Sequence, residues 1–305
     1  MRFDVEGKWL AIAVMACGQK APEQPEPRTL ASQQGVSGGI CADAHAAYWI
    51  VYRDTDQEGR VLRVDGHTGR LTVLADRQPR AMRGCAVDET HVYWINLGSA
   101  IMRVPKDGGP AEQVTGLDSD SPDNLVVRAG VVYWAAGGNA MRAPAGGGDA
   151  IVAFRHGRED IRVGSQIAVG STGIFWTEPI RGEVLRIPPS GGAPEVFASS
   201  ETTPQSVAVD DANVYWLAGS AVRIRRKVGG APARDLFSSD APLLALAESG
   251  RHLYVATSQG VHRIAKADGA AQCVSRGNLV AIGGGTVYSS RGSTASSVEL
   301  LAAPR

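Results

Sequence analysis

Short apolar runs alternate with turns along most of the chain, and one pattern among them recurs about every 40 residues. Its centre is an aromatic pair inside a run rich in Val, Ile and Tyr. The pair is found at Tyr48-Trp49, Tyr93-Trp94, Tyr133-Trp134, Phe175-Trp176 and Tyr215-Trp216, and in weaker form at Tyr254-Val255 and Tyr288-Ser289. A fixed period of this length is typical of repeat folds in which each copy is one supersecondary unit.

Each copy divides into four short strands. The first is apolar and ends at an acidic residue, as in residues 84–88, and the second carries the aromatic pair. The third has the form of residues 101–105, and a glycine-rich turn leads to a fourth such as residues 195–198. Runs of β-branched and aromatic residues bounded by Gly, Asp and Pro predict strands joined by tight turns. We therefore predict an all-β fold, a β-propeller with one blade per copy.

The seventh copy is incomplete at its C-terminal side. Residues 279–302 supply three strands, and the fourth is found near the other end of the chain, where residues 28–32 are similar to residues 195–199. We predict a seven-bladed propeller whose last blade is closed by this N-terminal strand, paired against residues 298–301. Such closure leaves no open edge between the first and last blades.

The N-terminal segment differs from the repeats. Arg2 and Lys8 precede a short apolar run that ends at Cys17. The run is too short to span a bilayer as a helix, which needs about 20 residues, and it has the length of a signal-peptide core. Residues 14–17, Val-Met-Ala-Cys, resemble the lipobox of bacterial lipoproteins. That resemblance implies diacylation of Cys17; an ordinary signal peptide is the alternative.

We therefore expect three parts: a lipoprotein-type signal peptide at 1–16, a Pro-rich tether at 17–27, and the propeller at 28–305. The expected location is the bacterial cell envelope, with a lipid anchor in the outer membrane. Lys and Arg together number 31, as do Asp and Glu, so the formal net charge is zero. This balance argues against a nucleic-acid partner and against membrane contact other than through the lipid. We expect a monomer.

Two cysteines lie on the first strands of adjacent copies. Aligned on Tyr48 and Tyr93, Cys41 and Cys85 are one register position apart, so their side chains should face opposite ways. A disulfide requires close Cβ atoms. We expect both residues to be small packing residues, and a bridge between them is the alternative. We also expect the aromatic pairs to fill the space between blades rather than to bind sugars.

One repeat resembles a known family. Residues 174–178, Ile-Phe-Trp-Thr-Glu, are followed by Val-Leu-Arg at 184–186 and by Ser-Val-Ala-Val-Asp at 206–210. This order resembles the YWTD propeller repeat. Because YWTD receptors have six blades, the chain is more similar to the bacterial seven-bladed propellers that include NHL-like and virginiamycin B lyase-like proteins. The resemblance implies the architecture, and fold resemblance does not carry function.

Functional residues are expected where loops break the repeat. The loops between second and third strands, and those between successive blades, should gather at one end of the propeller. We call their charged residues the rim. The rim consists of Arg53, Asp54, Asp56, Glu58, Arg77, Arg80, Arg83, Asp118, Asp120, Asp123, Arg155, His156 and Arg158. We expect a protein or glycan of the cell envelope to bind there.

Catalytic and metal-binding patterns are weak. A lyase needs a positioned general base, usually with an acid or a metal. His156 with Glu159 or Glu178 is the one candidate set, and the rim aspartates at 118, 120 and 123 lack the Gly and Glu of a calcium loop. We expect no cofactor and no metal. The sequence favours a non-catalytic envelope binding or scaffold lipoprotein; an exported propeller enzyme, a lyase or lactonase, and a passive structural component are the alternatives.

Overall fold

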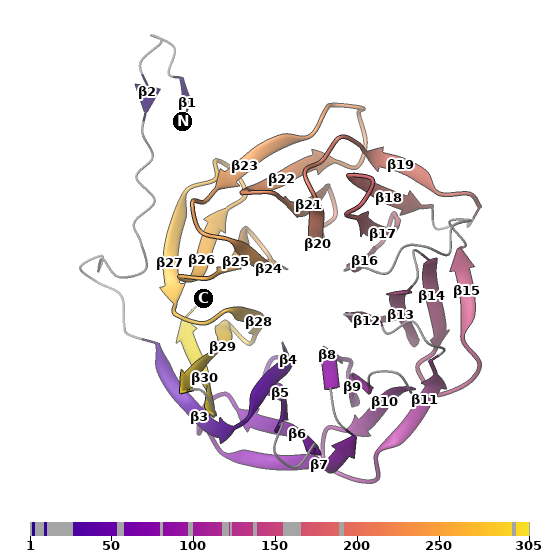
Figure 1. Ribbon diagram of the computed structural model, residues 1–305, viewed down its shortest axis with the longest axis vertical. Helices are drawn as coiled ribbons and strands as arrows, with labels where there is room; N and C mark the ends of the chain where they lie inside the picture. Colours follow the sequence, from indigo (N-terminus) through magenta and orange to yellow (C-terminus); the bar gives the residue numbers. More distant parts are fainter. Residues whose placement is uncertain are drawn as a thin grey trace.

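The computed structural model describes residues 2–3, 9–10, 27–53, 58–79, 82–96, 100–117, 122, 124–136, 139–154, 166–188, 192–294 and 297–304. Within these ranges the regular secondary structure consists of β-strands, which turns connect. Seven antiparallel four-stranded sheets are arranged in a ring (Figure 1). The predicted seven-bladed propeller is therefore confirmed. A separate pairing joins β1 (Arg2–Phe3) to β2 (Trp9–Leu10).

The first strand of each blade is innermost and the fourth is outermost. Blades 1 to 3 consist of β4 (Val36–Ala42), β5 (Ala46–Tyr52), β6 (Glu58–Asp65), β7 (Leu71–Pro79); β8 (Met82–Val87), β9 (His91–Asn96), β10 (Ala100–Pro105), β11 (Glu112–Gly116); β12 (Leu125–Arg128), β13 (Val131–Ala136), β14 (Asn139–Pro144) and β15 (Ile151–Phe154). Blades 4 to 6 consist of β16 (Ile167–Gly170), β17 (Gly173–Glu178), β18 (Glu183–Ile187), β19 (Glu195–Ala198); β20 (Pro204–Val209), β21 (Asn213–Ala218), β22 (Ala221–Arg226), β23 (Arg234–Ser238); β24 (Leu243–Ser249), β25 (His252–Thr257), β26 (Gly260–Ala265) and β27 (Ala271–Ser275).

Blade 7 is assembled from both ends of the propeller domain. Its first three strands are β28 (Leu279–Gly283), β29 (Thr286–Thr294) and β30 (Ser297–Pro304), and its outer strand is β3 (Arg28–Gln34). The pairing is antiparallel and places Arg28 opposite Ala302 and Gln34 opposite Ser297. The predicted closure by an N-terminal strand is confirmed (Figure 1).

The core lies between the blades. Neighbouring residues of a strand face opposite sides of its sheet, so each aromatic pair sends one ring to each adjoining blade. Tyr48 packs in one cluster with Trp94 of the next blade, and Phe175 packs with Trp216. These four rings are almost completely buried, and burying a large apolar side chain contributes roughly 1.5–3 kcal/mol. The aromatic repeat is therefore a packing device, as predicted.

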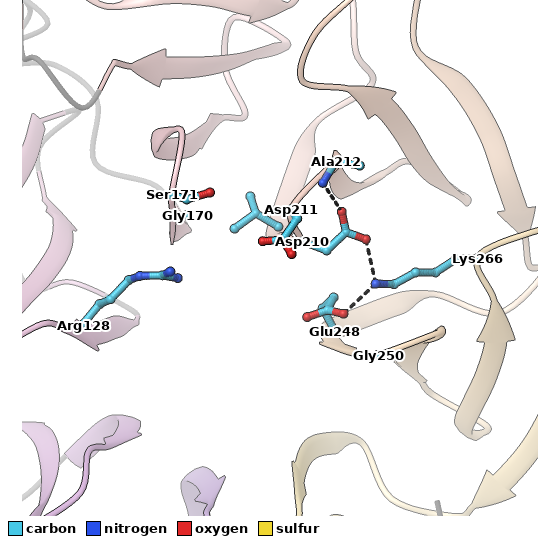
Figure 2. A pocket seen from close by; sticks show the side chains of 10 residues that line it. Arg128, Gly170, Ser171, Asp210, Asp211, Ala212, Glu248, Gly250 and Lys266 are labelled. Atoms are coloured by element: carbon cyan, nitrogen blue, oxygen red, sulfur yellow. Dashed lines mark hydrogen bonds and ion pairs between the residues drawn. The ribbon is translucent and has the colours of Figure 1, made fainter.

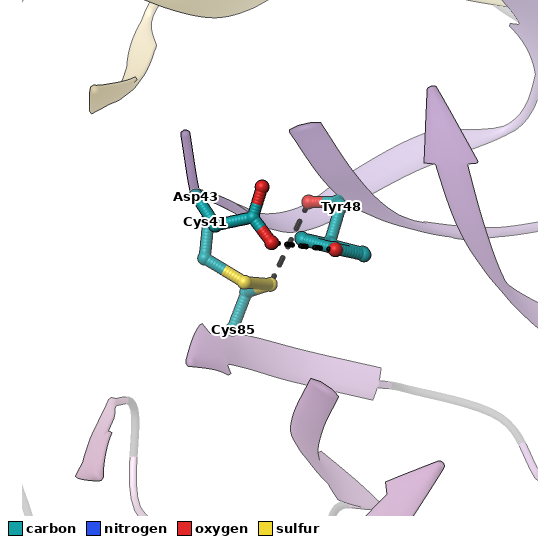
Figure 3. Close-up of a disulfide and its surroundings, with 4 residues drawn as sticks. All are labelled: Cys41, Asp43, Tyr48 and Cys85. Carbon is teal, nitrogen blue, oxygen red and sulfur yellow. Dashed lines mark hydrogen bonds between the residues drawn. A yellow bond between two sulfur atoms is a disulfide. The ribbon is translucent and has the colours of Figure 1, made fainter. Parts of the chain in front are cut away.

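The structure corrects one expectation. Cys41 on β4 and Cys85 on β8 form a disulfide, with their Cα atoms 5.3 Å apart (Figure 3). Their registers do direct the side chains to opposite faces, because Cys41 pairs with Tyr48 whereas Ala86, not Cys85, pairs with Tyr93. Blades 1 and 2 stack face to face, however, so opposite faces of consecutive blades meet. In the chain-entropy model, closing a loop of this length destabilises the unfolded chain by about 4 kcal/mol.

Among the residues described, no helix is long and apolar enough to cross a membrane.

Candidate functional site

A recurring ion-paired unit lies at one end of the propeller, where first strands turn into second strands. In blade 1, Asp43 follows β4 and its Oδ1 accepts hydrogen bonds from the backbone amides of His45 and Ala46, at 2.8 and 3.0 Å. Its Oδ2 accepts bonds from the Tyr48 hydroxyl at 2.8 Å and from Lys106 Nζ of blade 2 at 2.9 Å. One carboxylate therefore shapes its own turn and links two blades.

The same unit joins blades 5 and 6. Asp210 Oδ1 accepts from the amides of Ala212 and Asn213, at 2.9 and 2.7 Å. Its Oδ2 accepts from the Tyr215 hydroxyl and from Lys266 Nζ, both at 2.7 Å. Burial alone would raise the pKa of Asp210, but these donors, Lys266 foremost, lower it to about 2. The carboxylate is therefore ionised throughout the neutral range.

Lys266 makes a second ion pair. Its Nζ donates to Glu248 Oε1 at 2.5 Å, so it lies between two carboxylates of blades 5 and 6 (Figure 2). The ammonium also lies 5.2 Å from the centre of the Tyr215 ring. Burial and the Asp210 carboxylate raise the pKa of Tyr215, which keeps its hydroxyl a donor. The four groups hold one another in fixed positions.

A pocket of about 490 Å³ opens beside this unit. We call it the charged pocket. The turns of blades 3 to 6 form its wall, and its charged lining consists of Arg128, Asp210, Asp211, Glu248 and Lys266. Figure 2 shows Arg128 reaching into it from β12, across from Asp211. Pockets with a few convergent polar groups are the usual places where ligands bind.

Four rim residues lie among those described. Arg53 follows β5 and Glu58 begins β6, and the Arg53 amide donates to the Glu58 carbonyl at 3.0 Å. Both line a hollow of about 210 Å³. Arg77 and Arg83 lie near the end of β7 and the start of β8. By strand direction these positions belong to the rim end, opposite the charged pocket.

The other rim residues lie outside the described part of the chain, so the rim as a site stays a prediction. They are Asp54, Asp56, Arg80, Asp118, Asp120, Asp123, Arg155, His156 and Arg158. The same holds for Glu159 and for the lipidation candidate Cys17. Of the catalytic candidates, Glu178 is described, and its side chain is fully buried at the end of β17.

The pocket residues were missed at the sequence level, although the repeat contains a signal for them. The position five residues before the first aromatic is Asp43, Asp88 and Asp210 in three blades, but Arg128 in blade 3 and Gly170 in blade 4. The last two are single-residue departures inside turns of ordinary length, and both line the charged pocket. In the described ranges, no group of three or more His, Cys, Asp or Glu is placed to hold a metal ion.

Comparison with solved structures identifies other propellers. A virginiamycin B lyase from Staphylococcus aureus aligns with a TM-score of 0.69 at 14% identity, over 88% of this chain and 98% of the lyase. The WD40 propeller domain of Doa1 aligns with a TM-score of 0.67 at 13% identity, over 90% and 96%. A chain of the nidogen–laminin complex aligns with a TM-score of 0.58 at 14% identity, over 79% and 92%. At these identities the likeness shows the fold alone.

No protein-family model and no curated protein matches the chain.

Proposed function

We propose that this protein is a non-catalytic binding and scaffold module of the bacterial cell envelope, anchored by lipid at Cys17. The observation that carries the proposal is the charged pocket, which four blades build and which ion pairs hold in shape. A rigid ring supports it, so a ligand meets a surface that is already organised, and little ordering is needed on binding.

The rim is proposed as a second binding place, for a protein or glycan of the envelope. Its four described residues lie at the end opposite the pocket, and a module with a binding place at each end can hold two components together. Its side chains carry charges of both signs. Salt should therefore weaken binding at the rim, although neither positive nor negative charge dominates the electrostatic potential there. A chain of the nidogen–laminin complex, which is an assembly of two proteins, shares the fold.

Two observations favour binding over catalysis. A general base works best when its pKa lies near the operating pH, whereas Asp43 and Asp210 each have a pKa of about 2 and are committed to hydrogen bonds. Glu178 is buried and so does not face a substrate. An exported lyase or lactonase using His156 and Glu159 is the alternative, and a virginiamycin B lyase shares the fold.

The test is capture from detergent-solubilised envelopes on the immobilised propeller. We expect a partner that is released by salt and whose capture is weakened by charge reversal at Arg80, Arg158 or Asp120, with Arg234→Glu on the outer strand β23 as the matched control. Arg128→Glu tests the pocket end in the same assay. Capture of no partner, or equal capture by all variants, would contradict the proposal.

Lipidation is tested separately. The full-length chain should incorporate labelled fatty acid, and Cys17→Ser should abolish the label. An unlabelled chain that keeps Met1 in the cytoplasm would refute the anchor. The enzyme alternative is tested by assaying the protein against a panel of lactone and cyclic-peptide substrates. It predicts turnover of one of them, and substitution of His156 or Glu159 should abolish that turnover.

A further inference from the structure

Three blades place a lysine at the same position. Lys106, Lys227 and Lys266 each come directly after the third strand of their blade. Each backbone amide donates to the equivalent turn carbonyl of its own blade: Thr90, Ala212 and Arg251, respectively. The three side chains therefore extend toward the preceding blade from equivalent backbone positions, and their contacts in that blade can be compared directly.

Two of the three find a carboxylate and one does not. Lys106 meets Asp43, and Lys266 meets Asp210. In blade 4, which Lys227 faces, the position of the aspartate is Gly170, and the position of the tyrosine is Phe175. Lys227 Nζ lies 5.8 Å from the centre of the Phe175 ring, much as Lys266 lies over Tyr215. The lysine has kept its place, whereas its acceptor is missing.

Lys227 is consequently a buried cation without an acceptor. Its residue is 7% exposed, and among the described residues no atom accepts a hydrogen bond from its Nζ. A Cβ atom placed on Gly170 would lie 3.1 Å from this nitrogen, so the ammonium lies directly against the glycine. Burying a charge without a partner is unfavourable. Burial lowers the pKa of Lys227; Asp210 and Asp211 oppose this, and Arg128 and Arg186 add to it.

The glycine also belongs to the wall of the charged pocket. Gly170 and Ser171 line it beside Arg128. Arg128 Nη1 donates to the Val169 carbonyl at 2.9 Å, and no ion pair joins its guanidinium to a carboxylate of the described chain. Lys227 lies behind Gly170 and is not part of the pocket lining, so the cation exposed at the Gly170 end is Arg128, with Asp211 across from it (Figure 2). Asp210 and Glu248 lie farther along the pocket, beside Lys266.

We propose that the Gly170 end of the charged pocket is a subsite for the terminal carboxylate of a peptide, which Arg128 contacts and which the buried charge of Lys227 attracts through Gly170. The proposal rests on the binding function proposed above and names its ligand chemistry. Arg128 presents a planar donor pair suited to a carboxylate, and Lys227 supplies positive charge from beneath Gly170. The three acids nearby repel a polyanion, so a ligand with one carboxylate at a chain end is favoured over an acidic polysaccharide.

The test uses purified propeller and two probes, the tripeptide N-acetyl-Ala-Ala-Ala with a free C-terminus and the same tripeptide as its C-terminal amide. Calorimetric titration should show the acid binding about tenfold or more tightly than the amide. Lys227→Met replaces the apolar stem of the side chain by one of similar size and removes the charge. The Lys227→Met and Arg128→Gln substitutions should each weaken binding of the acid about tenfold. The control substitution Arg234→Gln should leave binding unchanged.

Three results would overturn the subsite: no detectable binding of the acid, equal binding of acid and amide, or unchanged affinity in Lys227→Met and Arg128→Gln variants whose melting temperatures show that they are folded. Tighter binding of a methyl glucuronide than of the tripeptide would overturn the peptide assignment. The outcome is independent of envelope capture. A propeller that binds the acid through Lys227 but captures no envelope partner supports the subsite and refutes the proposed function, and the reverse result refutes only the subsite.

Discussion

The junction between blades 5 and 6 and the junction between blades 4 and 5 are built on one plan with different groups. At the first, Asp210, Tyr215 and Lys266 neutralise and orient one another. At the second, Gly170 and Phe175 leave Lys227 buried without an acceptor. Packing is similar at both, since the aromatic rings and the lysine stems remain. The difference shows that a repeat can keep its fold although one copy has lost the aspartate that pairs with the lysine. In that copy the lysine charge stays unpaired, and it lies beside a pocket.

Removing the lysine should separate the two junctions most strongly. Lys266→Met leaves Asp210 and Glu248 without their shared cation, and we expect the free energy of unfolding to fall by about 3 kcal/mol. Lys227→Met removes a charge that has no partner, so stability should stay within about 0.5 kcal/mol or rise. Urea unfolding measures both. Equal losses in the two variants would mean that Lys227 is paired in solution.

A fall in pH should destabilise the junction between blades 5 and 6 more than the junction between blades 4 and 5. Asp43 and Asp210 have a pKa of about 2, below the 3.8 of an unperturbed aspartate. Because the folded value is the lower one, the stabilisation is complete above about pH 5 and is lost as the pH falls toward 2, by about 2 kcal/mol for each carboxylate. The junction at Gly170 has no such group. Unfolding free energies measured from pH 6 to pH 2 should fall less steeply in Asp210→Asn than in the wild type; parallel curves would contradict the assignment.

Exchanging the aromatic residues tests the hydroxyl. Tyr215→Phe removes one donor to a charged acceptor, and the loss should be about 1.5 kcal/mol. Phe175→Tyr buries a hydroxyl where blade 4 has no aspartate to accept its hydrogen bond, so stability should not rise and should fall by about 1 kcal/mol. Thermal melts of the two single variants are sufficient. An unchanged melting temperature for Tyr215→Phe, or a gain for Phe175→Tyr, would contradict the role given to the Asp210 hydrogen bond.

Restoring the carboxylate should give the smallest change and the most specific one. Gly170→Asp provides Lys227 with a partner, and we expect a gain of about 1 kcal/mol over Gly170→Asn, which has the same shape without the charge. The backbone at Gly170 is not in the left-handed region, and the nearest atom is the flexible end of Lys227. The aspartate should also prevent the acid tripeptide from binding. If the Gly170→Asp variant were less stable than the Gly170→Asn variant, the missing carboxylate would not be what distinguishes the two junctions.

The architecture could be predicted from the sequence because the same strand pattern occurs seven times along the chain. The period, the aromatic pairs and the similarity of residues 28–32 to other fourth strands predicted seven blades and their closure, and the structure confirms both. The disulfide was missed because register gives the face of a strand but not which blade that face meets. Cys41 and Cys85 point in opposite senses within their own sheets, and this brings them together across the interface.

The pocket was missed for a different reason. Loops of irregular length, where function was expected, belong to the rim end of the propeller. The pocket is built from turns of regular length, and its character comes from exchanges of single residues, Arg128 and Gly170, at a position that is an aspartate in blades 1, 2 and 5. The meaning of Gly170 depends on Lys227 of the next blade, and a side chain that reaches across an interface is visible only once the blades are assembled.

The closure of blade 7 has a consequence for the order of folding. β3 leaves the ribosome before every other strand of the propeller, whereas its partner β30 leaves last. The ring therefore cannot be completed until β30 has been made, and pairing of such distant segments is intrinsically slow. Until that step, β30 has an open edge that fits the β3 of any copy of the chain. At high concentration the same edge can accept a neighbour's strand, giving an exchanged dimer in place of the closed monomer.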